Sequence, residues 1–266
     1  MIKPASLPLL VLLGTLPAAI HADTSYTINN TTADAFLAAG SAGNPAGSDL
    51  TSLNFGGAGT LAIASASSTK GEFDSLIKFN LAGAVSQFDT TYGAGQWEIT
   101  GLTLQLASNF GVQGSQPNNN IFNKINAGSF GIQWLSYDGW TEGSGGGTGS
   151  PGFPGNSAVS LDSKPTLFSG AHHSLGTFTY TPPGNNIYAS YALALNSGLL
   201  ADAAGGGDVS LYFFAADDDV SYLFNARSFA SNHPELTISV TSVPEPAYWA
   251  AASFSLVAFA VLRRRL

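Results

Sequence analysis

The chain has 266 residues, no cysteine and a formal net charge of −8, and these three facts already exclude several classes of protein. Without cysteine, an exported protein has no disulfide framework, no thiolate metal site and no cysteine nucleophile. Because 17 acidic residues outnumber 9 basic ones, nucleic acid, which is a polyanion, is not an expected partner. An acidic surface suits solubility, cation binding or contact with a neutral or cationic polymer, and it selects none of these.

The first 22 residues have the pattern of a secretory signal peptide. Lys3 supplies the positive start, residues 7–19 form the apolar stretch, and a short segment ending in Ala22 follows. We expect cleavage between Ala22 and Asp23. The remaining body would then begin outside the cytoplasm. It keeps five basic residues against seventeen acidic ones, a formal charge of −12.

Residues 23–242 are predicted to form one all-β domain, a single β-sandwich or jelly roll. Short apolar runs with a period of two are separated by Gly, Asn, Ser and Pro, and long stretches with helical spacing are missing. Leu102, Leu104 and Leu106 keep this period without interruption, so one face of their strand must be core. A body of this length can bury a large core without cross-links. We predict strands at residues 25–28, 61–66, 73–81, 97–107, 130–136, 175–181, 187–195, 209–215 and 235–241.

Residues 33–37 are ambiguous, because Thr32 and Gly40 would cap a helix of one or two turns. A family resemblance favours a strand there. Residues 33–37, 43–48, 53–56 and 75–81 resemble the opening of a DNRLRE-type domain, and residues 99–106, 140–142 and 234–238 resemble its later parts. The arginines usual in that family near Leu53 and at Lys78 are absent here. The resemblance implies a β-sandwich of a secreted bacterial protein, related to modules that bind polysaccharides.

Three aromatic residues, Trp134, Tyr137 and Trp140, are candidates for carbohydrate binding. They lie near a predicted strand end, where loops gather, and rings on the face or rim of a sandwich can stack on sugar rings. Large aromatic side chains are also the natural filling of a core, and this alternative stays open.

The triplet Asp217-Asp218-Asp219 is a candidate metal site. It follows a predicted strand and concentrates hard oxygen ligands of the kind that calcium accepts. The triplet lacks the Asp-x-Asp-x-Asp-Gly spacing of a dedicated calcium loop, so a solvated acidic turn is the alternative. Calcium is the one cofactor that the sequence suggests.

Catalytic motifs are absent from the sequence, and we predict that the protein is not an enzyme. Neither Gly-x-Ser-x-Gly nor His-Glu-x-x-His occurs. His172 and His173 are adjacent, so on a strand they would face opposite sides and could not share a metal ion. Glu72 and Asp74 would lie on one face of a strand, as a glycoside hydrolase requires of its two carboxylates, but nearly any β-protein offers such a pair.

The last residues of the chain have the pattern of a single membrane-spanning helix followed by basic residues. The apolar run at residues 247–262 would make a helix of roughly 24 Å, just long enough to enter a hydrocarbon layer of about 30 Å. The arginines that follow it would stay in the cytoplasm. In chain order the parts of the tail, residues 243–266, are Pro244, Glu245, Pro246, the apolar run, Arg263, Arg264 and Arg265.

This tail resembles the PEP-CTERM sorting signal in the order and spacing of all its parts. The resemblance implies that an exosortase in the inner membrane recognises Pro244, Glu245 and Pro246, removes the helix, and passes the protein to the cell surface or extracellular matrix. A plain C-terminal membrane anchor is the alternative. We therefore expect an exported protein, briefly anchored in the inner membrane, with a structural or adhesive role in exopolysaccharide. A carbohydrate-binding module is the second reading, and a polysaccharide-degrading hydrolase is the third.

These signals predict the two ends of the mature protein. Intact-mass spectrometry of protein recovered from the surface and matrix fractions should find a chain that begins at Asp23 and has lost the apolar run. Full-length chain in the cytosol of the native host would contradict the expectation.

Overall fold

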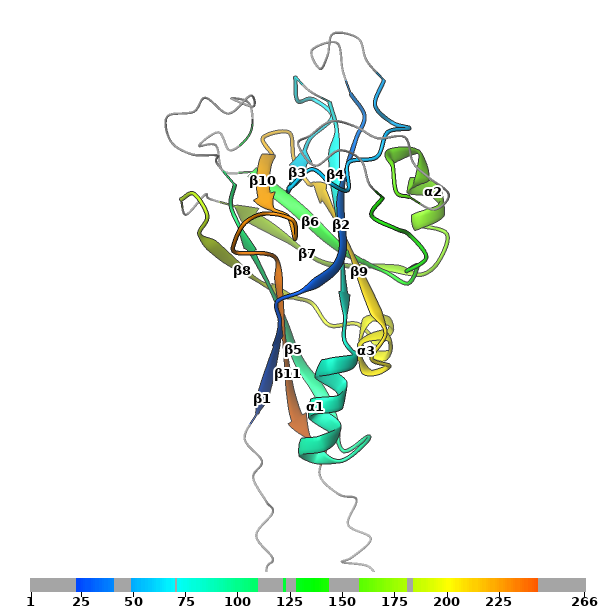
Figure 1. Ribbon diagram of the computed structural model, residues 1–266, viewed down its shortest axis with the longest axis vertical. Coiled ribbons are helices and arrows are strands. Elements are labelled where there is room, and N and C mark those ends of the chain that lie inside the picture. Colours follow the sequence, from blue (N-terminus) through cyan, green and yellow to red (C-terminus); the bar gives the residue numbers. More distant parts are fainter. Residues whose placement is uncertain are drawn as a thin grey trace, which may run out of the picture.

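The computed structural model describes residues 23–40, 49–69, 71–109, 122, 128–143, 158–180 and 184–243. Within these residues the fold is mostly β, and eleven strands form two antiparallel sheets (Figure 1). The predicted signal peptide and residues 244–266 of the predicted sorting signal lie outside the described residues. No helix in the described part of the chain is long and apolar enough to cross a membrane.

The smaller sheet, sheet A, has four strands in which buried side chains alternate with exposed or half-buried ones over most of their length. On β5 the leucines at 102, 104 and 106 are buried, as predicted, and the polar residues between them face outward. The strands lie in the order β1 (Thr24–Ile28), β11 (Glu235–Ser242), β5 (Trp97–Ala107) and β8 (Tyr188–Leu193).

The larger sheet, sheet B, has seven strands, and most of its central strands are buried on both faces. Segment 33–37 lies in a strand, which pairs with β4, so the helical alternative is wrong. The main path is β10 (Ser221–Asn225), β3 (Thr60–Ala64), β4 (Phe73–Asn80), β9 (Asp208–Ala215), β6 (Gly128–Leu135) and β7 (His172–Tyr180), and β2 (Thr31–Ala38) pairs beside it.

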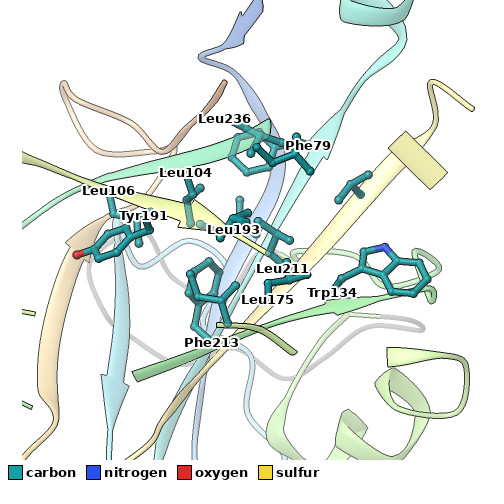
Figure 2. Packing of buried hydrophobic residues seen from close by; sticks show 14 of the residues in the cluster. Phe79, Leu104, Leu106, Trp134, Leu175, Tyr191, Leu193, Leu211, Phe213 and Leu236 are labelled. Carbon is teal, nitrogen blue, oxygen red and sulfur yellow. The ribbon is translucent and has the colours of Figure 1, made fainter. Parts of the chain in front are cut away.

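The main core lies between the two sheets, where inward side chains from both meet (Figure 2). Leu104 and Leu236 of sheet A face Phe79 and Phe213 of sheet B, and all four are at most 1% exposed. Because hydrophobic burial scales with the apolar area removed from water, this layer is the principal stabilising contact of the fold.

Two helices that we did not predict cover one end of this core: α1 (Ala82–Tyr92) and α3 (Ser197–Ala204). Each buries only two side chains four residues apart, Ala84 and Phe88 in α1 and the pair 199 and 203 in α3. So few apolar positions do not produce a readable helical period. Phe88 packs on Trp97 with ring centroids 5.2 Å apart, which ties α1 to β5.

A third layer covers the outer face of sheet B. We call residues 136–143 and 158–171 the cover segment; it includes the short helices η1 (Leu161–Ser163) and α2 (Lys164–Leu167). Trp140, Val159 and Leu167 of this segment pack on Leu76 and Tyr212 of the sheet in a second buried cluster. The cover segment thus buries the outer faces of strands β2, β4 and β9. These strands are then covered on both faces, which explains their nearly continuous burial.

The alternation on β5 predicts a sharp contrast between two neighbouring substitutions. Leu104→Ala should lower the free energy of unfolding by about 3 kcal/mol, because it removes apolar contacts and leaves a cavity. Thr103→Ala, on the outward face, should change it by less than about 0.5 kcal/mol. Chemical denaturation of both purified variants measures the difference. Equal losses would contradict the assigned faces.

Candidate functional site

A concavity with a polar lining lies on the outer face of sheet B, beside α2. The pocket has a volume of about 490 Å³. Residues on or next to strands β3, β4, β6 and β9 and on or next to α2 line it; Figure 1 shows where these elements lie. The side chains that line it and that carry polar or aromatic groups are Ser65, Glu72, Asp74, Gln133, Lys164, Phe168, Tyr212, Phe214, Asp217 and Asp218.

Two carboxylates and one ammonium group meet in this pocket. Lys164 Nζ lies 2.9 Å from Glu72 Oε1 and 2.9 Å from Asp74 Oδ2. Asp74 Oδ2 also accepts a hydrogen bond from the Tyr212 hydroxyl. The side chain of Asp74 is only 3% exposed, whereas those of Glu72 and Lys164 are 33% and 40% exposed. Asp74 is therefore the buried member that anchors the cluster, whereas Glu72 and Lys164 reach the solvent.

The burial of these groups shifts their pKa values in different directions. Desolvation raises the pKa of Asp74 to about 6, although Lys164 and Tyr212 oppose the rise. For Glu72 desolvation is the largest single effect and raises the pKa, but the hydrogen bonds with Lys164 and Asp74 and the charge of Lys164 together outweigh it, so the pKa lies below its ordinary value. Desolvation alone would lower the pKa of Lys164, but the two carboxylates raise it. At neutral pH Lys164 therefore stays charged between two carboxylates.

An aromatic wall stands beside the charged cluster. Phe168 of the cover segment packs edge-on against Tyr212, with ring centroids 4.9 Å apart, and Tyr212 lies 6.3 Å from Phe214. The Phe214 ring lies directly over Gly131 of the next strand, where a Cβ atom would come within 2.2 Å of the ring. Gly131 therefore allows the half-buried ring to lie close against the sheet at the edge of the pocket.

The three predicted sugar-stacking rings do not form a common face. Trp134 points into the core between the sheets and is 4% exposed, and Trp140 is 2% exposed beneath the cover segment. Tyr137 is half-buried against the same second cluster as Trp140. Neither indole is open to a sugar ring, so the alternative of core filling describes both tryptophans. The period of two on β6 could not show that Trp134 faces the core, because both faces of that strand carry buried side chains.

The three aspartates of the predicted metal site take part in separate hydrogen bonds. Asp217 accepts from the backbone N–H groups of Ser129 and Asp219, and Asp218 Oδ1 accepts from Ser65 Oγ at 2.8 Å. No group of three or more metal-ligating side chains that could hold an ion occurs in the described part of the chain. The acidic turn instead contributes Asp217 and Asp218 to the rim of the pocket.

The structure brings Glu72 and Asp74 of the sequence analysis together in the pocket, with Asp217 and Asp218 at its rim. The partners Lys164 and Tyr212 and the lining residue Gln133 were missed, because they come from distant parts of the chain and no motif connects them. The adjacent His172 and His173 lie exposed at the start of β7. The proposed cleavage residue Ala22 and the sorting residues Pro244, Glu245, Pro246, Arg263, Arg264 and Arg265 lie outside the described residues.

No protein-family model matches the chain, and no curated protein matches it either. The resemblances to PEP-CTERM and DNRLRE-type sequences therefore stay predictions.

A second buried carboxyl, Asp34 of β2, lies outside the pocket. Asp34 Oδ2 accepts the Arg227 backbone N–H at 2.6 Å, and Arg227 Nε lies 2.5 Å from Glu142 Oε2 of the cover segment. In the described part of the chain, no hydrogen bond reaches Asp34 Oδ1. Burial raises the pKa of Asp34 to about 7; the Arg227 N–H opposes this and Glu142 adds to it.

This shift predicts a pH-dependent stability. The folded protein binds the Asp34 proton more tightly than the unfolded chain, so the free energy of unfolding falls as pH rises from about 4 to about 7. Asp34→Asn keeps an oxygen acceptor for Arg227 and has no proton to lose. At pH 8 the variant should therefore be more stable than the wild type, by on the order of 3 kcal/mol, and the difference should shrink towards pH 4.

Urea denaturation at several pH values measures this effect. Asp74 contributes in the same direction in both proteins, so the difference between their curves isolates Asp34. Asp162→Asn, at an exposed position of the cover segment, controls for the substitution itself. Parallel curves for the wild type and Asp34→Asn would refute the assignment.

Proposed function

We propose that this is an exported cell-surface or extracellular-matrix protein with an adhesive or structural role in exopolysaccharide, and that the pocket on sheet B holds a sugar residue. The observation that carries the proposal is the combination of Glu72, Asp74 and Gln133 with the rings of Phe168 and Phe214 in one open pocket. The volume of about 490 Å³ falls in the range typical of small-ligand sites.

The lining matches the chemistry of a pyranose. A sugar ring has apolar C–H faces that pack on aromatic rings, and hydroxyl groups that both donate and accept hydrogen bonds. Carboxylates supply acceptors, Lys164 supplies donors, and the Gln133 amide supplies both. Because the pocket is open and acidic, a neutral sugar enters at a lower electrostatic cost than an anionic one.

The same cluster favours binding over hydrolysis. A glycoside hydrolase places a sugar between a general acid and a second carboxylate that acts directly or through water. Here the Lys164 ammonium lies within 2.9 Å of both Glu72 and Asp74 and joins them in one ion cluster. Asp74 is buried and already accepts from Lys164 and Tyr212, so Glu72 is the carboxylate of this cluster that reaches the solvent and can accept a hydrogen bond from a sugar. We assign the pocket no catalytic step.

Localisation and sorting belong to the same proposal. The signal peptide pattern, the Pro-Glu-Pro triplet and the terminal arginines support export, transient anchoring in the inner membrane and sorting by an exosortase. We further propose that the body is a β-sandwich of the DNRLRE-like kind. Two antiparallel sheets around a common core support that assignment.

The test is glycan binding with a matched pair of phenylalanine substitutions. Exopolysaccharide from the native host, cut to soluble oligosaccharides, is titrated calorimetrically against the wild type, Phe214→Ala and Phe178→Ala. Phe214 lines the pocket, whereas Phe178 is equally half-buried on β7 but packs on the inter-sheet core. Phe214→Ala should raise the Kd about tenfold, which is about 1.4 kcal/mol, and Phe178→Ala should leave it unchanged.

Two results would overturn the proposal. The first is a wild type that does not bind the oligosaccharides. The second is an equal loss of binding in both variants, which would show a general loss of structure. New reducing ends in the titrated sample would favour the hydrolase reading instead.

A further inference from the structure

The outer face of sheet A carries a regular array of hydroxyl and amide side chains. The strand register places three threonines, Thr27, Thr237 and Thr103, side by side on neighbouring strands. The row on one side contains Ser25 and Ser239, and the row on the other contains Gln105 and Ser190, with Glu235 at its end. Strands about 4.8 Å apart and a repeat of about 6.7 Å along each strand give these groups an even spacing in two directions.

Hydrogen bonds between neighbouring strands hold these side chains in place. Ser25 Oγ lies 2.9 Å from Ser239 Oγ, and Thr27 Oγ1 lies 2.8 Å from Thr237 Oγ1. Each such pair uses one O–H and one lone pair, so one O–H and three lone pairs per pair still point to a partner. Because the rotamers of these side chains are already fixed, they lose little conformational entropy when a ligand binds.

The centre of the array is uncharged, although the predicted body carries a formal charge of −12. Among the described positions on this face, the charged side chains are Glu98 near one end and Glu235 at the other. The side chains between them are exposed or half-buried, so solvent reaches them. Solvated strands usually carry lysine and glutamate, which discourage other chains from docking, and the middle of this face has neither.

We propose that this face, which we call the hydroxyl face, is a second docking surface and binds one extended chain of an uncharged polysaccharide. A neutral chain with hydroxyl groups along its length complements a neutral lattice of donors and acceptors, and neutral groups cost far less to desolvate than charged ones. An anionic polymer would be repelled by the acidic body. A cationic polymer would favour the carboxylates elsewhere on the surface.

The inference rests on the proposed function and adds a mechanism to it. The hydroxyl face and the pocket lie on the outer faces of two different sheets, which share the core between them. One molecule can therefore hold two polysaccharide segments at once. Linked sites raise the effective affinity for a network of chains well above that of either site alone.

Co-sedimentation with regenerated amorphous cellulose, an insoluble neutral glucan, tests the hydroxyl face. The full-length gene and its variants are expressed in the native host, and the purified proteins are compared. Thr103→Lys places a charge in the middle of the face, and Thr90→Lys places the same charge at an exposed position of α1, which belongs to neither site. Thr103→Lys should weaken binding at least tenfold, and Thr90→Lys should bind as the wild type does.

Further variants keep the test decisive. If Thr103→Lys does not fold, Ser190→Lys on the edge strand β8 makes the same change at an exposed position. Phe214→Ala should still sediment with the polymer while it loses soluble oligosaccharides, which separates this inference from the pocket. A wild type that does not sediment, or lysine variants on this face that bind normally, would overturn the inference and leave the pocket untouched. A wild-type dimer that Thr103→Lys dissociates would also overturn it, because the face would then join two copies of the chain.

Discussion

The buried ammonium group of Lys78 is the contact on which the outer half of sheet B depends. Lys78 projects from the central strand β4 into a nearly closed apolar layer, where desolvation lowers its pKa. Its Nζ donates to the backbone carbonyls of Asp138 and Trp140 at 2.7 and 2.8 Å and lies 4.6 Å from the centre of the Trp140 ring. A buried charge is tolerated only when such partners replace water. Lys78 therefore fixes the start of the cover segment, and the rest of that segment positions Lys164 at the pocket.

A second set of contacts fastens the same segment from the side of the 53–56 turn. Asn54 Nδ2 donates to the carbonyls of Glu142 and Val159, both at 2.7 Å, and so joins the two halves of the cover segment. Gly56 lies so close to Glu142 that a Cβ atom would fall within 2.0 Å of its carbonyl oxygen. The segment is thus held by polar groups at fixed points and by apolar packing between them. This arrangement explains why a layer without long helices or strands stays closed.

The sequence predicted the strands better than it predicted the layers. Alternation located nine strands to within about three residues, because each has at least one face against the main core. Strand β10 was missed, since the acidic turn before it hides the buried pair Tyr222 and Phe224. Trp134 could not be assigned to the inner face from the sequence, because both faces of β6 carry buried side chains. Trp140 could not be placed because it belongs to a cover segment that has no periodicity. The sequence indicated only part of the pocket. Glu72 and Asp74 are two residues apart in the sequence, but Lys164 reaches them only through the tertiary fold.

Stability alone does not account for the Asp74, Lys164 and Tyr212 cluster. Replacing a buried ion pair by apolar residues of similar size is often neutral or stabilising, because desolvation offsets the attraction between the charges. Asp74 sits next to Leu76 on β4, at the border of the apolar second cluster, where an apolar side chain would pack well. A carboxyl at this position, with its pKa raised by burial and an ammonium group from another layer, therefore points to a ligand site. Burying the Asp74 carboxyl costs desolvation free energy. In the proposed site this cost serves to hold the exposed partners, Glu72 and Lys164, at fixed positions for binding.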